Sequence, residues 1–369
     1  MRKFRSPVLR SQTRRIDKHL LFVVLALSLF GVMMVFNASG VDATRNFGDQ
    51  FFFAKRQLIW AAFGALGLLF FSRIPYQLLQ RFALPIFGIS LLLLGLVLLP
   101  NFGISSLGAS RWLEIGPIVF QPAEFAKLAL VIYLAAILAK NRSLVLFLIT
   151  VGLTTGLVLV EPDLGTAAVI AAIGLVIYFV SGAPLWYFFA ILPAALISGL
   201  ILTLTSAYRK ERLMTFLNPE IDPLGTSYHI RQILIALGSG GLFGMGLGQS
   251  RQKYLFLPEP TTDSIFAIIG EELGFIGSAA VVLAFIYIIW KGFTIASRVS
   301  DPFGKLLAVG VTSWIGIQAV VNLSSMVAFI PLTGVPLPLL SYGGSSLITM
   351  LAAVGILLNV SKFQTAKAK

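Results

Sequence analysis

Cysteine is absent from all 369 residues of this chain, and its absence excludes disulfide bonds, thiolate metal sites and cysteine nucleophiles. Only two histidines occur, His19 and His229, so a zinc site built from histidines is not expected. Any bound metal would be a hard cation on carboxylates. Charge is also scarce, because Asp, Glu, Lys and Arg make up 12% of the chain, whereas soluble domains carry about 25%. Hydrophobic residues make up 57% and the mean hydropathy is +0.91, which indicates a membrane protein.

Apolar runs recur along the whole chain and predict an all-α polytopic membrane protein, with ten transmembrane helices in one domain over residues 19–361. Each run holds at least about 15 mainly apolar residues, enough for a tilted helix. The expected spans are 19–39, 58–72, 83–99, 123–139, 144–160, 164–180, 186–205, 264–290, 304–330 and 339–360. Residues 206–262, between spans 7 and 8, are expected to form a large extracytoplasmic loop, and long loops are usually functional.

Basic residues set the expected orientation. The tail 1–18 is rich in Arg and Lys, which places it in the cytoplasm by the positive-inside rule. With ten spans the tail 362–369 is cytoplasmic too, and most of the 28 Lys and Arg residues then fall on that side. This topology accounts for the net charge of +13, so nucleic acid is not an expected partner. We expect a multi-pass protein of the cytoplasmic (inner) membrane with both termini inside.

The long loop has two recognisable parts. Ile230, Ile233, Leu234 and Leu237 follow a helical spacing, which predicts a helix on the membrane surface. The alternative is an eleventh span over 227–248, which would move the C-terminus outside. Six glycines between residues 238 and 248 do not match a dinucleotide fingerprint and predict a re-entrant turn.

Asp263 is the strongest candidate for chemistry, because it stands where the loop meets the eighth span. A carboxylate at a lipid boundary is costly and marks a functional site. Burial there raises its pKa, which suits it to accept a proton. Glu259, Thr262 and Glu271 are close to it in sequence. The alternative is that Asp263 caps the helix, since Asp and Thr are preferred N-cap residues.

Two further groups of polar residues fall at the outer ends of expected spans. Glu124 and Lys127 are i, i+3 neighbours, and they either line a cavity where Lys127 meets phosphate or neutralise each other in the membrane. Glu161 and Asp163 form either an ordinary polar turn or, with Asp263, the ligands of a hard cation. In the preceding loop, Arg111 is a candidate anion contact, and Trp112 is either its neighbour at the site or an interfacial belt residue.

The last expected span begins irregularly. Pro336, Pro338 and the Gly343-Gly344 pair predict a broken helix start, which at that depth is tolerated only against protein or a water-filled cavity. Ser341, Ser345 and Ser346 lie in this segment and are candidate substrate contacts. Gln318 and Asn322 in the ninth span are expected to hydrogen-bond between helices.

Several long motifs together resemble the SEDS (shape, elongation, division and sporulation) family, to which FtsW and RodA belong. The resemblance runs along nearly the whole chain, and its division branch is the more similar one. Pro260-Thr261 and Ser264 depart from the usual pattern, but the aspartate between them is kept. The motifs are Phe51-Phe52-Phe53-Ala54-Lys55-Arg56, Arg111-Trp112, Gln121-Pro122-Ala123-Glu124-Phe125-Ala126-Lys127, Glu161-Pro162-Asp163-Leu164-Gly165-Thr166, Tyr208-Arg209-Lys210-Glu211-Arg212, Tyr228-His229, Leu257 to Phe275 and Leu340 to Ser346.

The resemblance implies an inverting peptidoglycan glycosyltransferase that polymerises lipid II at the outer face of the membrane, in cell division or elongation. The expected partners are lipid II, a class B penicillin-binding protein, single-span division or elongation proteins and membrane lipids; a Mg or Mn ion is a candidate cofactor. The expected catalytic residues are Asp263, Glu124 and Lys127, the expected substrate contacts are Arg111, Trp112, His229, Glu259, Thr262, Ser341, Ser345 and Ser346, and the candidate metal ligands are Asp263, Glu161 and Asp163. The alternatives are a lipid II transporter and a scaffold of the division complex.

Overall fold

The computed structural model describes residues 16–99, 102–106, 109–116, 118–218, 227–254 and 256–365. The expected basic tail up to residue 15, part of the long loop (219–226) and the end of the C-terminal tail (366–369) lie outside the described residues.

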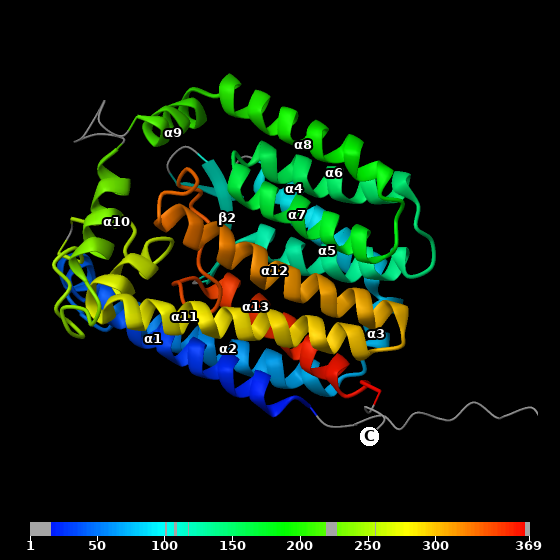
Figure 1. The fold of residues 1–369 in the computed structure, drawn as a ribbon, viewed down its shortest axis with the longest axis horizontal. Coiled ribbons are helices and arrows are strands. Elements are labelled where there is room, and N and C mark those ends of the chain that lie inside the picture. Colours follow the sequence, from blue (N-terminus) through cyan, green and yellow to red (C-terminus); the bar gives the residue numbers. More distant parts are fainter. Residues whose placement is uncertain are drawn as a thin grey trace, which may run out of the picture.

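Long helices lie side by side and form an elongated bundle (Figure 1). The helices of this part of the chain are α1 (Lys18–Phe47), α2 (Phe52–Arg73), α3 (Gln77–Arg81), α4 (Ala83–Val97), α5 (Pro122–Leu138), α6 (Leu144–Val160), α7 (Leu164–Val180), α8 (Trp186–Thr205), α9 (Ala207–Leu217), α10 (Tyr228–Ser239), α11 (Ile265–Arg298), α12 (Pro302–Met326) and α13 (Gly344–Ser361).

Each of the ten expected spans coincides with a helix. Six of them, α1, α2, α8, α11, α12 and α13, are long and apolar enough to cross a membrane, and α4, α6 and α7 are shorter apolar helices. The protein is therefore a mainly helical, multi-pass membrane protein, and ten spans remain a prediction. The alternative of an eleventh span is not supported, because α10 has 12 residues, too few to cross a bilayer.

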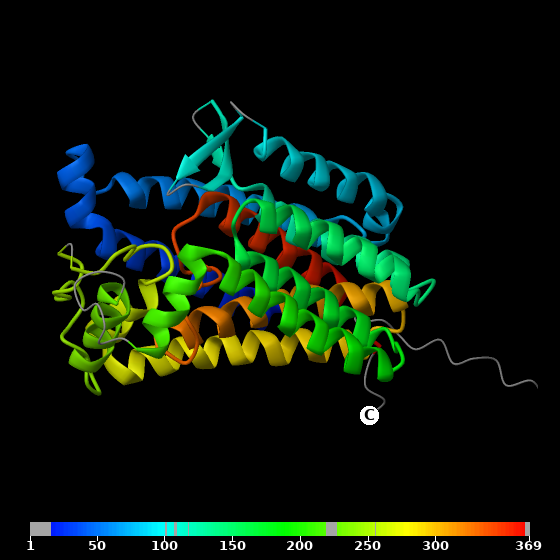
Figure 2. The same ribbon diagram turned by 90° about the horizontal axis from the view of Figure 1, so that it is seen from above.

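A small antiparallel sheet, which the sequence did not predict, accompanies the predicted helices. Its strands β1 (Gly103–Ser106), β2 (Ala109–Ile115) and β3 (Ile118–Phe120) are ordered β1-β2-β3, with Leu113 opposite Phe120. Ile115 before the Gly116 turn (φ 62°) and Ile118 and Val119 after it are β-branched, which favours strands on both sides of the turn. Figure 2 shows the sheet beside one end of α4, and β2 presents Arg111 and Trp112 there.

The two ends of the bundle differ. The start of α1 and the end of α13 lie at one end (Figure 1), where Asp17 N donates to Ser361 Oγ at 3.1 Å. We call the opposite end, which carries β2, α9 and α10, the loop end. α12 and α13 form the buried centre, whereas α8 has no buried side chain and lies at the edge, as expected of a helix that faces lipid.

Helix α11 is broken at Gly274, whose φ of 65° and ψ of −163° are not helical. A break frees backbone groups that lipid cannot satisfy, and the glycine-rich segment after α10 pairs with them. Met245 N and Gly246 N donate to the carbonyls of Glu271 and Glu272 at 2.9 and 3.0 Å, and Phe275 N donates to Gly241 O at 2.9 Å. The expected re-entrant turn is therefore packed against the broken helix.

Candidate functional site

Asp263 lies at the loop end, directly before α11, in a segment that three separate hydrogen bonds hold in place. Tyr342 N donates to Thr261 O at 2.8 Å, Ser341 Oγ to Thr262 O at 2.5 Å, and Asn322 Nδ2 to Asp263 O at 2.8 Å. The donors come from α12 and from the turn before α13. All three bonds end on backbone oxygens of the segment, so they fix its position without using the Asp263 carboxylate as an acceptor.

The capping interpretation of Asp263 receives no support from the helix start. The N-cap residue of α11 is Ser264, and it makes no side-chain capping hydrogen bond. The Asp263 carboxylate instead accepts from Thr262 Oγ1 at 3.3 Å, a hydroxyl that also donates to Glu259 Oε2 at 3.0 Å. Burial raises the pKa of Asp263 above its usual 3.8, and hydrogen bonds and the Arg212 guanidinium partly oppose this. Such a carboxylate is a better proton acceptor than an ordinary aspartate.

A cavity of about 190 Å³ opens beside this segment, between α9, α10 and the turn that contains Leu332. Arg212 and His229 both line it. His229 Nε2 lies 2.8 Å from Ser264 Oγ, next to Asp263. Burial, reinforced by the Arg212 charge, lowers the pKa of His229 to about 4, so the ring is neutral at physiological pH. A base, a neutral imidazole and a guanidinium therefore converge at the loop end.

Arg212 was not among the expected site residues, although its motif carried part of the family resemblance. Its Nη1 donates to Leu332 O at 3.1 Å, and its charge acts on both Asp263 and His229. The signal for it was topological: Arg209, Lys210 and Arg212 are basic residues in a loop assigned to the outside, against the positive-inside trend.

Glu124 and Lys127 form a buried ion pair, not the lining of an open cavity. Lys127 Nζ lies 2.7 Å from Glu124 Oε1 and 2.9 Å from Gln318 Oε1, and both charged side chains are 1% exposed. The ammonium also lies 5.3 Å from the ring of Trp314. This geometry supports the self-neutralising interpretation and corrects the expectation that Lys127 meets phosphate.

The Glu124–Lys127 pair is nevertheless connected to the segment that holds Asp263. Gln318 Nε2 donates to Pro336 O at 2.9 Å, in the irregular turn before α13. Ser341 in this turn is buried and binds the Thr262 carbonyl, and Ser345 Oγ accepts from Gln121 N at 3.2 Å. These two serines stabilise backbone and are not open substrate contacts; Ser346 is half-buried beside them.

Arg111 and Glu161 meet at the junction of α6 and α7. Arg111 Nε donates to Glu161 O at 3.1 Å and its Nη2 to Pro162 O at 2.7 Å, while Trp112 is half-buried in the sheet. Neither carboxylate oxygen of Glu161 has a hydrogen-bond partner among the described residues. Burial, and secondarily the Asp163 charge, raises the pKa of Glu161 to about 8.

The expected cation site of Asp263, Glu161 and Asp163 does not assemble. Within the described residues no group of three such side chains is placed to hold a metal ion. Asp163 instead caps α7, accepting from Thr166 N at 2.9 Å and from Thr166 Oγ1 at 2.8 Å. Glu271, expected beside Asp263, accepts from Ser250 Oγ at 2.5 Å in a different cluster. The residues present do not fit a three-carboxylate site.

Known proteins resemble the chain over nearly its full length. The family model described as "Cell cycle protein" (FTSW_RODA_SPOVE) matches residues 18–366. Stage V sporulation protein E of Bacillus subtilis (strain 168) is 42% identical over 362 residues, 95% of this chain and 99% of that protein. A protein of Trichlorobacter lovleyi named "Probable peptidoglycan glycosyltransferase FtsW" is 42% identical over 353 residues, 94% and 93% of the two chains. A solved structure described as "Structural coordination of polymerization and crosslinking by a peptidoglycan synthase complex" contains a chain with a TM-score of 0.77 and 30% identity, covering 94% of this chain and 97% of that one.

Proposed function

This chain belongs to the FtsW, RodA and SpoVE family of cell cycle proteins, and we propose that this peptidoglycan glycosyltransferase polymerises lipid II with Asp263 as its general base. One observation supports the assignment of the base. Three hydrogen bonds hold the backbone oxygens of residues 261–263, and the segment places the Asp263 carboxylate, whose pKa is raised, at the loop end.

The substrate explains why such a base belongs at a membrane boundary. Lipid II has a polyprenyl tail that stays in the bilayer and a disaccharide-pyrophosphate head at the outer face. An enzyme for it needs a proton acceptor at that level and cations near the pyrophosphate. Asp263 supplies the first. Arg212, and Arg111 on β2, are the candidate cations at the same end of the bundle.

The proposed reaction is a single inverting displacement. Asp263 takes the proton of the 4-hydroxyl of the acceptor N-acetylglucosamine, and that oxygen forms a bond to C1 of the donor N-acetylmuramic acid. The bond from C1 to the pyrophosphate oxygen breaks, and undecaprenyl pyrophosphate leaves with the electron pair. Neutral His229 orients Ser264 and the adjoining Asp263, and Thr262 and Glu259 complete the polar edge of the site. The Glu124–Lys127 pair acts as a positioning element through Gln318.

Polymerisation of purified lipid II, followed on gels that resolve glycan strands by length, tests this function. We expect polymer with the purified chain, and more when a class B penicillin-binding protein is present, since the structurally similar complex joins polymerisation to cross-linking. A chelator arm tests the candidate Mg or Mn ion, for which the described residues form no group of three ligands. Absence of polymer in every condition would refute the assignment.

The proposed topology has ten spans in the cytoplasmic membrane with both termini in the cytoplasm, next to membrane lipids and single-span partner proteins. The chain has no cysteine, so single introduced cysteines can be labelled without background. Asn46→Cys, in the last turn of α1, is expected to react with an impermeant maleimide in intact cells. Asn141→Cys, between α5 and α6, is expected to react only after permeabilisation. The reverse pattern would contradict the orientation.

Transport of lipid II, the alternative function, would be favoured by free ion-coupling charges within the membrane. The structure gives Glu271 and Glu272 another use, because Ser250 Oγ, Arg251 N and Lys253 Nζ bind their carboxylates. These two acids stabilise the break in α11, and they do not line an open path.

A further inference from the structure

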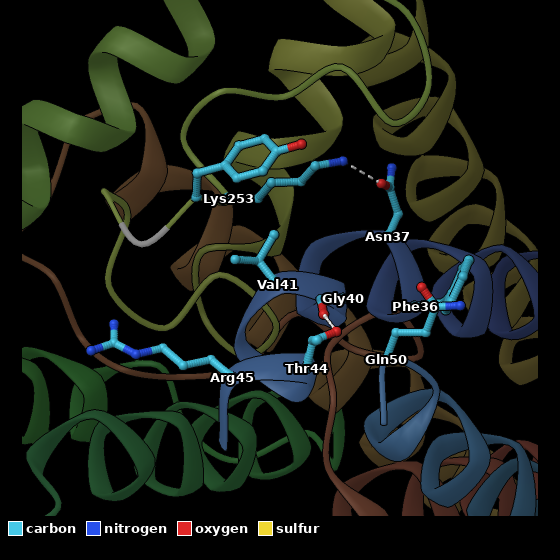
Figure 3. A pocket seen from close by; sticks show the side chains of 9 residues that line it. Phe36, Asn37, Gly40, Val41, Thr44, Arg45, Gln50 and Lys253 are labelled. Carbon is cyan, nitrogen blue, oxygen red and sulfur yellow. Dashed lines mark hydrogen bonds between the residues drawn. The ribbon is translucent and has the colours of Figure 1, made fainter. Parts of the chain in front are cut away.

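A second cavity lies at the C-terminal end of α1, and neither Asp263 nor its neighbours line it. It has a volume of about 520 Å³, within the range of small-molecule sites. Phe36, Asn37 and Arg45 of α1 line it together with Gln50, Lys253 and Tyr254. Figure 3 shows α1 on one side and Lys253 reaching toward Asn37 from the other. Two connections far apart in the sequence therefore form one depression.

The floor of the cavity is a buried polar cluster. Lys253 Nζ donates to Asn37 Oδ1 and Gly248 O, both at 2.7 Å, and to Glu272 Oε1 at 3.2 Å. Asn37 Nδ2 donates to the same glutamate. Lys253 is 7% exposed, and its three ammonium hydrogens have three acceptors, so its charge is paired and its donors are engaged. The floor is rigid and close to neutral.

The walls indicate what this cavity holds. Because Lys253 is paired with Glu272, Arg45 is the exposed cation, and one guanidinium does not make a phosphate trap. Gln50 is an exposed amide and Tyr254 is 57% exposed, so polar groups lie beside the apolar part of the lining. The Phe36 ring is stacked on Phe51 with centroids 5.1 Å apart, which fixes an aromatic wall. Such a lining suits a neutral sugar chain. The aromatic faces of the protein can pack against the C–H surface of a sugar ring, and its amide and hydroxyl groups can bind the equatorial hydroxyl and acetamido groups of the sugar.

The cavity is also connected to the proposed catalytic segment. Lys253 and Tyr254 belong to the connection that leads to Asp263, and Glu272 lies in the short first part of α11 that follows it. Ser250 N and Lys253 Nζ both bind Glu272, so the floor of the cavity and the start of α11 share one hydrogen-bond cluster. A chain extended at Asp263 therefore has a rigid polar surface at the same end of the bundle.

We propose that this cavity binds the β-1,4-linked N-acetyl sugar strand that the enzyme makes and retains it between additions. The inference rests on the proposed function, and its ligand is the glycan product, not the lipid-linked donor. Bound here, a strand remains on the protein while the next lipid II enters, which makes elongation processive.

The test is binding of chitotetraose, a soluble β-1,4-linked N-acetylglucosamine tetramer, to the full chain in detergent micelles without lipid II. Saturation-transfer NMR is expected to show saturable binding that Tyr254→Ala and Gln50→Ala each weaken about fivefold or more. Phe243→Ala is the matched control, because Phe243 is an aromatic side chain 80% exposed at the same end and does not line the cavity. Its affinity is expected to equal that of the wild type. In the lipid II assay, the two cavity variants are expected to give shorter strands, and the control variant strands of normal length.

Binding needs no turnover, so this result is separable from the assignment of the base. Asp263→Asn is expected to bind chitotetraose as tightly as the wild type, whether or not Asp263 proves to be the base. No saturable binding by the wild type, or equal affinities of Tyr254→Ala and Phe243→Ala, would overturn the proposal. Thermal unfolding of each variant identifies a general loss of structure, and Gln50→Ala provides the second, independent substitution.

Discussion

Replacing Asp263 by asparagine separates a proton acceptor from a structural residue. Asparagine has the same shape, caps helices as well as aspartate and can accept the Thr262 hydrogen bond, but it cannot take a proton. The bonds from Tyr342 N, Ser341 Oγ and Asn322 Nδ2 end on backbone oxygens, so the substitution leaves them intact. The change therefore removes the chemistry and keeps the geometry.

The expected magnitudes follow from these contacts. Loss of a general base lowers the turnover rate about 10²- to 10⁴-fold, which corresponds to a barrier higher by about 3–5 kcal/mol. Stability is expected to stay equal or rise slightly at neutral pH. Burial raises the pKa of Asp263 in the folded state, so the folded protein is penalised as pH rises above the unfolded value and asparagine removes the penalty.

The assay is lipid II polymerisation measured as an initial rate, with thermal unfolding of the same preparations. Asp49→Asn is the matched control, since Asp49 is a carboxylate paired with Lys55 at 2.8 Å near the surface, in the connection between α1 and α2. The wild-type rate is also expected to fall on the acid side, at a pH above the usual 3.8 of aspartate. A folded Asp263→Asn protein that polymerises lipid II at the wild-type rate would refute the assignment.

Three other substitutions test the structure around the site. Glu161→Gln is expected to stabilise the folded protein, because the folded state disfavours the ionised form of this carboxylate. The gain in the free energy of unfolding grows as pH rises from 4.5 to about 8 and reaches at most about 5 kcal/mol, which unfolding midpoints measured over this pH range would show. A difference that does not depend on pH would contradict this. Lys127→Met leaves Glu124 buried without its cation and is expected to lower the free energy of unfolding by about 3–5 kcal/mol. The double variant Lys127→Met with Glu124→Gln is expected to recover part of this loss, and denaturant or thermal unfolding in detergent measures both changes. Gly274→Ala is expected to destabilise the fold and reduce activity, since its φ is 65° and a Cβ would press on the glycine-rich segment, while Gly95→Ala, in open space, is the neutral control.

The helices could be predicted from the sequence because lipid imposes a simple rule on long apolar runs. Residues 144–160, 164–180 and 186–205 begin and end as helices where they were expected to. The sheet at 103–120 could not be found this way, because its strands are short and their pairing depends on a turn at Gly116. The break at Gly274 was not predicted either, because the residues that bind Glu271 and Glu272 beside it lie about 20 positions earlier in the chain.

In the candidate site, too, the sequence predicts features that depend on neighbouring residues and misses those that depend on distant ones. Asp263 could be singled out from one stretch of chain, because a carboxylate beside an apolar run is anomalous by itself. The roles of Lys127 and Ser341 could not, since each depends on a partner far away in sequence, Gln318 for the first and Thr262 for the second. A buried pair and an open cationic contact have the same spacing in sequence, and only tertiary packing distinguishes them.

The distribution of these contacts explains why a polar catalytic segment is stable at the end of an apolar bundle. Its backbone carbonyls are bound by donors from α12 and from the turn before α13, and the first turns of α11 that follow it are held by the glycine-rich segment. Both supports are irregular backbone that packs against protein, the condition under which such backbone is tolerated at membrane depth. The Asp263 carboxylate therefore keeps a fixed place, although the three bonds that hold its segment end on backbone oxygens. An enzyme that must accept a new lipid-linked sugar at each addition needs this combination, because the base has to meet each acceptor hydroxyl in the same place.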